Sequence, residues 1–251
     1  MARELPRRGH DVVLTDTTAP GAGASGNLQA VCAPVLDAAA SPRQDFYRSA
    51  FVLASRQHPR CGVLRQADTQ KDADALRQAA SVFGDLDGWL KWREADPESN
   101  DGLWMPTAGV ADFAAFSQSI LDVLPNSAKC WPWAVREIHR QDHRWQLRSE
   151  TGETLEADAV VLACAAGVTR LAPTSAWPLR TIRGQVTHAR ATAESKTTAH
   201  AVVGEAYLCP AHGGGHSVGA TFDPDDDYAQ DRASDHADNQ RRAELTDHAW
   251  A

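Results

Sequence analysis

An acidic residue at the end of an apolar run, followed by a loop of small residues, is the feature of this sequence best suited to chemistry. The apolar run is Val12–Leu14, the acid is Asp16, and the loop is residues 19–27, APGAGASGN. A carboxylate at the tip of a buried strand can accept hydrogen bonds from ribose hydroxyls. A loop of Gly, Ala and Ser lets backbone N–H groups approach a ligand closely. The pattern is typical of α/β sheets that bind nucleotides.

Metal binding and nucleophilic catalysis find little support in the sequence. The five cysteines are scattered without a CxxC pair, at positions 32, 61, 130, 164 and 209, so neither a disulfide framework nor a zinc site is indicated. His212 and His216 flank three glycines, which predicts a flexible hairpin rather than a rigid pair of ligands. The acidic residues 223–227 lack the Gly and Glu spacing of an EF-hand. No GxSxG motif is present.

Length and charge bound the class of protein. A chain of 251 residues can form one large domain or two modest ones. The net charge of −8 argues against non-specific nucleic-acid binding, although it does not exclude a local basic patch. The longest apolar run, Ala159–Val168, is far short of the roughly 20 residues that a membrane span needs. Because the first eleven residues also lack the apolar core of a signal peptide, we expect a cytoplasmic protein without a membrane segment.

Helical patterns dominate the first half of the chain. Residues 2–9 are typical of the last turns of a helix, with basic residues near the end and Gly9 as a stop. Residues 41–44, SPRQ, form a capping box with proline at the first helical position. The helix that they open ends before Pro59 and carries four apolar residues on one face: Phe46, Ala50, Leu53 and Ala54. Further predicted elements are a strand at 11–16, a helix at 71–83, strands at 88–94 and 102–106, and a helix capped by Asp112.

Strand patterns dominate the second half. Residues 133–140 and 144–150 are predicted to form a meander with a third strand, 159–163. Because this third strand is continuously apolar, it is predicted to be buried on both faces. It ends in a second small-residue turn at 164–167. The remaining predicted elements are a strand at 180–189 whose interior Gly184 marks a bulge or a close approach, strands at 201–210 and 217–222, and a polar helix at 232–249.

Several blocks in this order resemble the FAD-dependent amine and amino-acid oxidoreductases of the D-amino-acid oxidase and glycine oxidase class. The blocks are Gly23–Gln29, Ser49–Phe51, Val160–Gly167, Ile182–Val186, Tyr207–Pro210 and Val218–Thr221. Within that class the chain is similar to the C-terminal oxidoreductase domain of the MnmC family, which builds 5-methylaminomethyl-2-thiouridine at the wobble position of tRNA. The motifs GASGN-x-Q and RGQV are specific in combination and weak singly.

The resemblance implies an α/β fold: an FAD-binding, Rossmann-like domain of the glutathione-reductase type with a substrate domain on a mixed or antiparallel sheet. We assign residues 1–83 and 108–178 to the FAD-binding domain and residues 84–107 and 179–230 to the substrate domain. Residues 231–251 form a polar tail helix. The family's first strand, its GxGxxG turn and its C-terminal segment have no counterpart here, and Ala30 stands where the family usually has Gly. We therefore expect a piece truncated at both ends, without a methyltransferase half.

The resemblance also assigns candidate site residues. The expected contacts to FAD are Asp16, Ser25, Gly26, Asn27, Gln29, Val135, Ala165, Ala166, Gly167, Gly184 and Gln185. Arg183 and Tyr207 are expected on the substrate side, Arg183 facing a carboxylate or the flavin and Tyr207 donating a hydrogen bond. From the residues alone, a solvated turn acid is the lesser alternative for Asp16. Half of a surface ion pair is an equal alternative for Arg183, and a structural side chain is an equal alternative for Tyr207. No metal site is expected.

The expected reaction follows from the resemblance. FAD accepts a hydride from the carbon next to nitrogen in a carboxymethylaminomethyl uridine of tRNA, and hydrolysis of the imine releases glyoxylate. A methyltransferase, fused or separate, is the expected partner. One alternative is an oxidase of free glycine, sarcosine or a D-amino acid, which the acidic charge favours slightly. A second alternative is a non-catalytic remnant of the fold.

Overall fold

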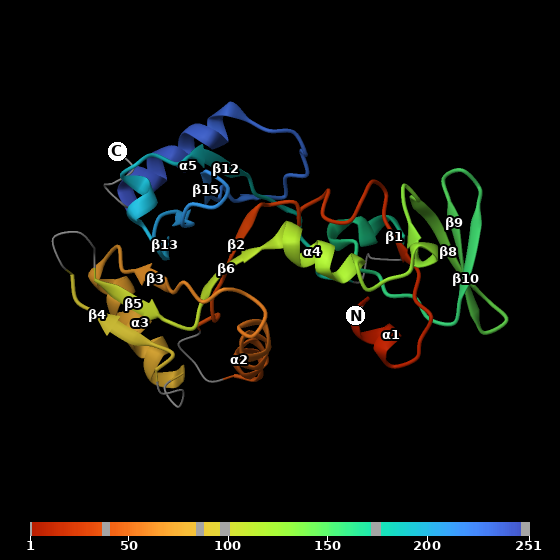
Figure 1. Ribbon diagram of the computed structural model, residues 1–251, viewed down its shortest axis with the longest axis horizontal. Helices are drawn as coiled ribbons and strands as arrows, with labels where there is room; N and C mark the ends of the chain where they lie inside the picture. The colour runs from red at the N-terminus through yellow and green to blue at the C-terminus, as the bar shows by residue number, and fades with distance from the viewer. Residues whose placement is uncertain (1, 37–40, 84–87, 96–100, 172–176, 247–251) are drawn as a thin grey trace. The chain divides into compact units, whose positions relative to one another are not determined.

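The computed structural model describes residues 2–36, 41–83, 88–95, 101–171 and 177–246 (Figure 1). The chain forms two compact units, and each is assembled from three segments. The first unit contains Met1–Gly26, Phe113–Ile182 and Pro224–Asp227. The second unit contains Asn27–Asp112, Arg183–Asp223 and Tyr228–Ala251. Both units are therefore discontinuous in sequence, and the mixed α/β class predicted from the sequence is confirmed.

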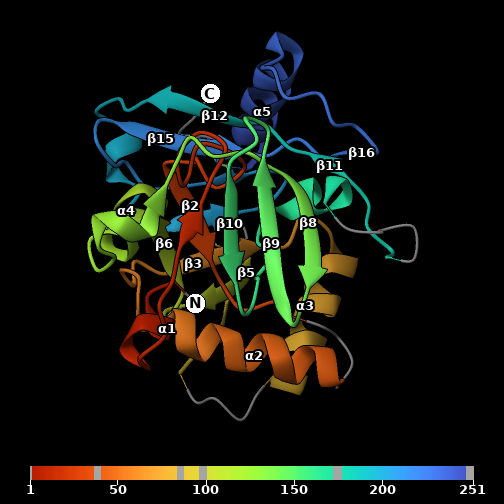
Figure 2. The same cartoon turned by 90° about the vertical axis from the view of Figure 1, so that its right-hand side faces the viewer.

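The first unit is built around a short parallel pair and an antiparallel meander. α1 (Glu4–Arg7) leads through Gly9, whose φ is 83°, toward β1 (Leu14–Thr15). β1 pairs in parallel with β7 (Lys129–Cys130). The other elements are α4 (Phe113–Leu121), the 3₁₀ turn η1 (Asn126–Ala128), the strands β8 (Val135–Gln141), β9 (Arg144–Ser149) and β10 (Thr154–Ala157), and the 3₁₀ segment η2 (Ala165–Arg170). The first two predicted strands of the meander are confirmed by β8 and β9, and β10 completes an antiparallel sheet beside them (Figure 2).

The predicted third strand of that region is wrong in its position. Strand β10 ends at Ala157, and residues 159–163 have no strand conformation. Val161 is 55% exposed and Leu162 is 37% exposed, so the run is not buried on both faces. A parallel strand becomes fully buried only between neighbouring strands and covering helices. Among the described residues no strand pairs with 159–163, so its apolar character alone does not make it a strand.

The second unit contains a mixed sheet of seven strands in the order β12-β15-β14-β13-β3-β5-β4. One half comes from β3 (Val63–Gln66), β4 (Lys91–Arg93) and β5 (Gly102–Met105). The other half comes from β12 (Val186–Arg190), the 3₁₀ turn η3 (Ser195–Thr197), β13 (Ala201–Val203), β14 (Tyr207–Leu208) and β15 (Gly215–Gly219). The halves meet where β13 pairs in parallel with β3, with Ala201 opposite Val63. Every other pair in this sheet is antiparallel.

Two apolar clusters cover the two faces of this sheet. On one face Val202, Leu208 and Val218 pack against Ala243 of α5 (Ala233–Thr246). The cluster on the other face joins strand residues to the helix α2 (Pro42–Ala54) and to β6 (Gly109–Asp112), which pairs with β2 (Gln29–Cys32). Its buried members are Phe51, Val63, Met105, Ala108, Val110, Ala201 and Cys209. The helix α3 (Gln70–Phe83) contacts β5. The predicted polar tail helix is therefore part of the core of the second unit.

The α2 helix begins as its sequence predicts, but its apolar row points outward. The Ser41 hydroxyl accepts a hydrogen bond from the backbone N–H of Gln44 at 3.1 Å, which confirms the cap. Phe46 and Leu53, members of the predicted apolar face, are 68% and 61% exposed. Phe51, on the opposite side of the helix, is 4% exposed and joins the core. The helix thus carries apolar side chains on two faces, of which the sheet buries one.

The predicted strand 180–189 is divided at its glycine. β11 (Ile182–Arg183) pairs with β16 (Asp223–Pro224), and β12 begins after Gly184 and Gln185. Residues 27–83 lie in the second compact unit, although they were assigned to the FAD-binding domain. A compact unit need not coincide with a functional domain, so that assignment stays a prediction. No helix among the described residues has the length and apolar character needed to cross a bilayer.

Candidate cofactor and substrate sites

Asp16 lies directly after β1, at the carboxyl end of the parallel pair. Its backbone N–H donates to Cys130 O at 3.3 Å, and its carbonyl accepts from Trp133 N at 2.8 Å. The β1 backbone is thereby held to the segment that enters β8 at Val135. One carboxylate oxygen, Oδ1, accepts from the backbone N–H of Thr18 at 2.9 Å. Within the described part of the chain Oδ2 has no partner, so Asp16 keeps one acceptor for a ligand hydroxyl.

The small-residue loop after Asp16 folds tightly on itself. The Gly26 N–H donates to Gly23 O at 2.9 Å, and the Ala22 N–H donates to Ala19 O at 3.0 Å. A Cβ at position 26 would lie 2.6 Å from Gly21 O, a distance that no side chain tolerates. A Cβ at Gly23, in contrast, would meet nothing within 4 Å. The conformation of the loop therefore requires glycine at position 26, while Ser25 is exposed and Asn27 is half-buried.

The second small-residue turn lies in η2. Ala165 has a φ of 45°, a conformation that L-residues rarely adopt, and both Ala165 and Ala166 are exposed. Gly167 closes the turn by donating to Cys164 O at 2.8 Å. A cavity of about 100 Å³ opens on this turn, lined by Ala165, Ala166, Thr169, Leu179, Arg180 and Thr181. The predicted turn is thus an accessible surface of the first unit.

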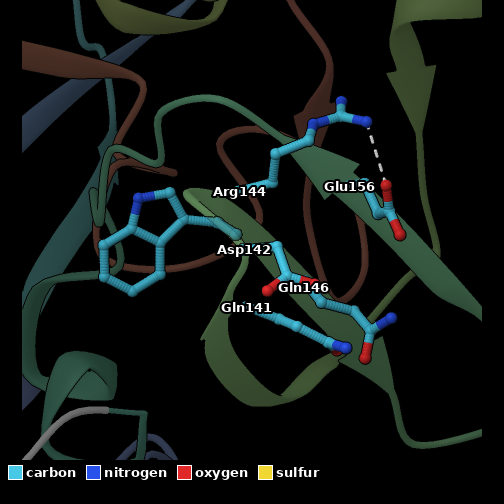
Figure 3. A pocket seen from close by; sticks show the side chains of 6 residues that line it. Gln141, Asp142, Arg144, Gln146 and Glu156 are labelled. Carbon is cyan, nitrogen blue, oxygen red and sulfur yellow. Dashed lines mark hydrogen bonds and ion pairs between the residues drawn. The ribbon is translucent and has the colours of Figure 1, made fainter.

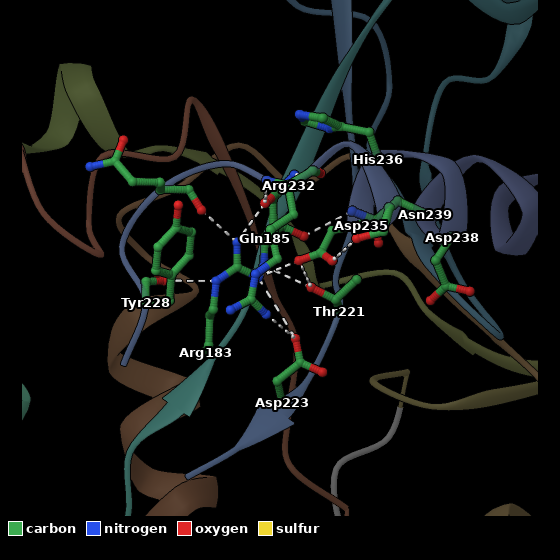
Figure 4. Close-up of polar contacts among 12 residues, drawn as sticks. Arg183, Gln185, Thr221, Asp223, Tyr228, Arg232, Asp235, His236, Asp238 and Asn239 are labelled. Carbon is green, nitrogen blue, oxygen red and sulfur yellow. Dashed lines mark hydrogen bonds and ion pairs between the residues drawn. The ribbon is translucent and has the colours of Figure 1, made fainter. Parts of the chain in front are cut away.

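Arg183 lies in a polar cluster between the start of β12 and the first turn of α5 (Figure 4). Its side chain is 8% exposed and forms an ion pair with Asp235. The other N–H groups of its guanidinium donate to Gln185 Oε1 at 2.7 Å, to Tyr228 O at 2.8 Å and to Gln230 O at 2.8 Å. We expected this guanidinium to meet a carboxylate or the flavin. The carboxylate that it meets belongs to the chain itself, so Arg183 fixes the position of its neighbours.

Gln185 connects the same strand to α5. Its Nε2 donates to Arg232 O at 2.9 Å, and its Oε1 accepts from Arg232 N at 2.8 Å. Its backbone N–H donates to Thr221 Oγ1 at 3.1 Å, and its carbonyl accepts from Asn239 Nδ2 at 2.8 Å. A Cβ at Gly184 would lie 3.1 Å from Thr221 O, so this glycine permits a close backbone approach. The RGQ sequence therefore holds α5 against the sheet.

The α5 side of this cluster was missed by the sequence analysis, which assigned residues 231–251 to a polar tail. A hydrogen bond from Arg183 lowers the pKa of Asp235, and partial burial opposes the shift. Asp235 also accepts from Thr221 Oγ1 at 3.3 Å and from Ser234 Oγ at 3.1 Å. The available signal was an acid in the first turn of a helix, where the macrodipole favours a negative charge.

Gln29 forms a bridge between β2 and the strands that follow Tyr207. Its side-chain amide is enclosed, because the residue is only 5% exposed. Nε2 donates to Pro210 O at 2.9 Å, and Oε1 accepts from Ser217 N at 3.0 Å. Both ends of the amide are therefore occupied by protein. A second contact links the β2–β6 pair to the segment between β14 and β15. Asp112 of β6 pairs with Gln29 across the strands, and its Oδ2 lies 3.1 Å from His212 Nε2.

Tyr207 lies on β14, opposite Gly219 of β15. Its ring packs against the cluster that contains Cys209 and Cys61. Burial, with a smaller contribution from Cys209, raises the pKa of the Tyr207 hydroxyl to about 12. A Cβ at Gly219 would lie 3.4 Å from this hydroxyl, so the glycine leaves room beside it. Like any tyrosine hydroxyl it is protonated at neutral pH and can donate a hydrogen bond, and burial extends the protonated form to higher pH.

A larger cavity, of about 280 Å³, lies on the meander of the first unit (Figure 3). It is lined by Gln141, Asp142, Arg144, Trp145, Gln146 and Glu156. Arg144 Nη1 lies 2.9 Å from Glu156 Oε2, so its principal charges are paired. None of the predicted site residues lines it. Within the described ranges no group of three or more His, Cys, Asp or Glu side chains is arranged to hold a metal ion.

The structure thus brings predicted residues together in three places. In the first unit the backbone of Asp16 forms hydrogen bonds with Cys130 and Trp133, shortly before Val135 in the chain. In the second unit Arg183 and Gln185 are in direct contact, and Gln29 binds close to the strand of Tyr207. A mixed α/β fold with a strand-end carboxylate and two small-residue turns defines the class of α/β proteins that bind a nucleotide cofactor.

The chain belongs to the FAD dependent oxidoreductase family, whose model matches residues 1–249. FAD is the cofactor of this family. Three curated relatives have the same name, tRNA 5-methylaminomethyl-2-thiouridine biosynthesis bifunctional protein MnmC. The relative from Chromohalobacter salexigens is 30% identical over 95% of this chain and 37% of its own length. The Pseudomonas putida relative is 33% identical over 98% and 39%, and the Thiobacillus denitrificans relative is 33% identical over 96% and 43%. The chain therefore spans about two fifths of the length of these relatives.

Solved structures support the fold. Glycine oxidase from Geobacillus kaustophilus superposes with a TM-score of 0.76 at 20% identity, over 99% of this chain and 75% of that one. L-proline dehydrogenase from P. horikoshii superposes with a TM-score of 0.76 at 14% identity, over 99% and 73%. These likenesses confirm the expected fold of the D-amino-acid oxidase type, and at this level of identity they concern the fold alone.

Proposed function

We propose that this chain belongs to an FAD-dependent oxidoreductase that removes the carboxymethyl group from 5-carboxymethylaminomethyl-(2-thio)uridine at the wobble position of tRNA. The observation that carries the proposal is the shared name of relatives that are 30–33% identical over 95–98% of the chain. The substrate is then a secondary amine whose nitrogen bears a CH₂–COO⁻ group. We propose that the protein acts in the cytoplasm and that a methyltransferase, fused or separate, methylates the amine that is released.

The proposed reaction balances as an oxidation followed by a hydrolysis. The N–CH₂ bond of the carboxymethyl group loses two electrons and two protons and becomes an imine. Water then adds to the imine carbon, and cleavage of the C–N bond gives glyoxylate and the aminomethyl uridine. Bound FAD supplies the two-electron acceptor. No strong base is required if the amine reaches the site unprotonated, so we assign none.

Asp16, the loop that follows it and Val135 are proposed to contact the adenosine end of FAD. Asp16 keeps Oδ2 for a ribose hydroxyl, since only Oδ1 is bound to Thr18. We propose that the backbone at Val135 meets the adenine. Ser25 is proposed to present its backbone N–H to the pyrophosphate. Gly26, whose own N–H donates to Gly23 O, is proposed to let the loop backbone approach the cofactor closely, because a side chain does not fit at this position. Ala165, Ala166 and Gly167 are proposed as an open surface beneath the cofactor.

Residues of the second unit are proposed to act around the reacting end. Tyr207 is proposed to donate a hydrogen bond to the substrate, because its hydroxyl carries a proton and Gly219 leaves room beside it. Asn27 is proposed to contact the cofactor at the end of the loop. Gln29, whose side chain is bound at both ends, contributes through its backbone and by holding β2 in place. Arg183 acts through Gly184 and Gln185, whose backbone is proposed to approach the flavin.

The test combines a spectrum with a choice of substrates. The purified chain is mixed with FAD, and the visible flavin spectrum and the thermal shift are recorded. It is then incubated with tRNA carrying carboxymethylaminomethyl uridine, or with glycine, sarcosine or a D-amino acid. We expect a yellow protein that FAD stabilises, and nucleoside mass spectrometry that shows loss of the carboxymethyl group.

Two outcomes would overturn the proposal. Oxidation of a free amino acid without any change in the tRNA would establish the alternative oxidase, which the net charge of −8 favours. A colourless protein that gains no thermal stability from FAD would overturn both enzymatic functions and support the non-catalytic remnant. The two outcomes are distinct, because the first requires bound flavin and the second excludes it.

A further inference from the structure

The outward face of α2 is an unusually apolar and aromatic surface. We define the α2 outer face as Arg43, Phe46, Tyr47, Ala50 and Leu53. Phe46 is 68% exposed, Leu53 is 61% exposed and Tyr47 is 36% exposed. Phe46 and Leu53 lie opposite Phe51, which anchors the helix in the core at 4% exposed, and Tyr47 lies at the edge of the face. Neighbouring exposed apolar side chains on one helix face are typical of an interaction surface.

The segment of the chain that carries this face is positively charged, although the protein as a whole is acidic. Residues 41–60 contain four arginines and one aspartate, a net charge of +3 in a chain whose net charge is −8. The arginines are Arg43, Arg48, Arg56 and Arg60. Within the described part of the chain none of the four forms an ion pair with a carboxylate. Their charges are therefore available to an anionic partner.

Aromatic and guanidinium groups are already stacked on this face. The Arg43 guanidinium lies 5.6 Å from the centre of the Tyr47 ring. Phe46 and Tyr47 pack edge to face with their ring centres 5.7 Å apart. Exposed rings beside arginines are what proteins use to stack unpaired bases while neutralising phosphates.

We propose that the α2 outer face binds the anticodon stem-loop of the tRNA substrate, with arginines on phosphates and Phe46 and Tyr47 against unpaired bases. The inference rests on the proposed tRNA substrate. RNA is favoured over a second protein because the segment that carries the face has four arginines and a single acidic residue, Asp45, and this excess of positive charge matches a polyanion. An RNA loop also offers several bases without partners, and the wobble base lies in such a loop.

Two variants test this surface, and a third serves as a matched control. Arg43→Ala combined with Arg56→Ala removes two exposed charges, and Phe46→Ala removes the most exposed ring of the face. The control is Arg140→Ala, which removes another arginine placed over a ring, 5.7 Å from the centre of Trp145 on the meander. Affinity is measured by fluorescence anisotropy with an anticodon stem-loop RNA at several salt concentrations. Circular dichroism and thermal unfolding verify that each variant is folded.

We expect Phe46→Ala and the double arginine variant each to weaken RNA binding by roughly tenfold, as loss of one stacked base or two phosphate contacts would. The double variant also reduces the slope of log affinity against log salt by about 1.4, because each single-strand phosphate contact contributes about 0.7. Arg140→Ala leaves both quantities unchanged. Oxidation of sarcosine, wherever the wild type shows it, is unaffected by the α2 variants.

Several results would overturn the inference. If the α2 variants bind the RNA as tightly as the wild type does, or if Arg140→Ala weakens binding equally, the surface is wrong and the proposed function stands. If Phe46→Ala changes the sedimentation mass while RNA affinity is unchanged, the face joins copies of the chain instead. If the wild type binds no RNA but oxidises free amines, both the surface and the tRNA substrate are wrong.

Discussion

The chemistry of Tyr207 is set by its surroundings. Burial raises the pKa of its hydroxyl to about 12, from an ordinary value of 10.0. Because the folded value lies above the unfolded one, the neutral form is favoured in the folded state. Stability is unaffected below pH 10 and falls as the pH rises from 10 toward 12, where the unfolded chain ionises first.

A tyrosinate titration followed by ultraviolet absorbance tests this assignment. The chain has three tyrosines, and we expect one of them to ionise late, near pH 12. Tyr207→Phe removes the late phase, whereas Tyr47→Phe, a change at a partly exposed ring, leaves it intact. A late phase that persists in Tyr207→Phe would show that another residue is responsible. We also expect Tyr207→Phe to slow amine oxidation without weakening FAD binding, because it removes a donor and no volume.

Gly26 and Gly23 form a matched pair within one loop. A Cβ at position 26 would lie 2.6 Å from Gly21 O, while a Cβ at position 23 would meet nothing within 4 Å. Gly26→Ala therefore displaces the loop backbone, and we expect FAD affinity to fall by about tenfold, which corresponds to about 1.4 kcal/mol. Gly23→Ala should change it little. Quenching of flavin fluorescence measures both affinities, and equal losses would contradict a role for the loop geometry.

At the scale of elements, Gln29 fastens β2 to the hairpin beyond Tyr207. Gln29→Leu leaves Pro210 O and Ser217 N buried without their partner, so we expect a loss of about 1–3 kcal/mol in the free energy of unfolding. Gln29→Glu places a carboxylate oxygen against Pro210 O and should destabilise at least as much. Urea unfolding measures both variants.

Gln66→Leu is the control for this pair. Gln66 is equally buried, on β3 of the seven-stranded sheet, but its Oε1 has no hydrogen-bond partner among the described residues. Replacing an unsatisfied amide by an apolar group of similar size is nearly neutral or stabilising. If Gln66→Leu and Gln29→Leu were equally destabilising, the effect would come from packing rather than from the bridge.

The contribution of the α5 contacts to the free energy of unfolding is expected to fall at low pH. The folded pKa of Asp235 lies below its ordinary value of 3.8, chiefly because Arg183 donates to its carboxylate. Its contribution to stability is therefore complete above the ordinary value and is lost as the pH falls through the lower folded value. We expect Asp235→Asn to be less stable at neutral pH and to lose less stability between pH 5 and pH 2. Acid titration of the unfolding free energy, with the exposed Asp231→Asn as a control, measures the difference.

At the scale of the whole molecule, features that depend on nearby residues could be predicted from the sequence, whereas contacts between residues far apart in the chain could not. The cap at Ser41, the turns of the meander and the glycine at 184 each depend on neighbours within a few residues, and each was predicted correctly. The bridge from Gln29 to Pro210 spans 181 residues, and the ion pair from Arg183 to Asp235 spans 52. Nothing local to either residue identifies those partners, so side chains assigned to a ligand turn out to hold the fold.

Periodicity also fails wherever tertiary contacts decide between alternatives. α2 has apolar side chains on two faces, and the sequence does not indicate which face the sheet covers. The run at 159–163 has the apolar character of a buried strand, but burial depends on strands supplied from elsewhere in the sheet. The candidate residues come from the resemblance and stay a prediction, whereas the contacts that some of them make within the chain required coordinates.

The discontinuous build of the second unit makes its halves depend on each other. β3 and β13 meet in the middle of the sheet, and the core on one face mixes Val63 and Met105 with Ala201 and Cys209. Residues 1–182 alone would leave Val63 and its neighbours without the strand that covers their edge. We expect this fragment to be aggregation-prone or to lack cooperative unfolding, because an uncovered apolar edge strand pairs with other chains. Co-expression with residues 183–251 should restore a soluble complex with a cooperative thermal transition. A fragment 1–182 that remains monomeric and unfolds with the same cooperativity as the full chain would show that β3, β4 and β5 do not need the β13 side of the sheet.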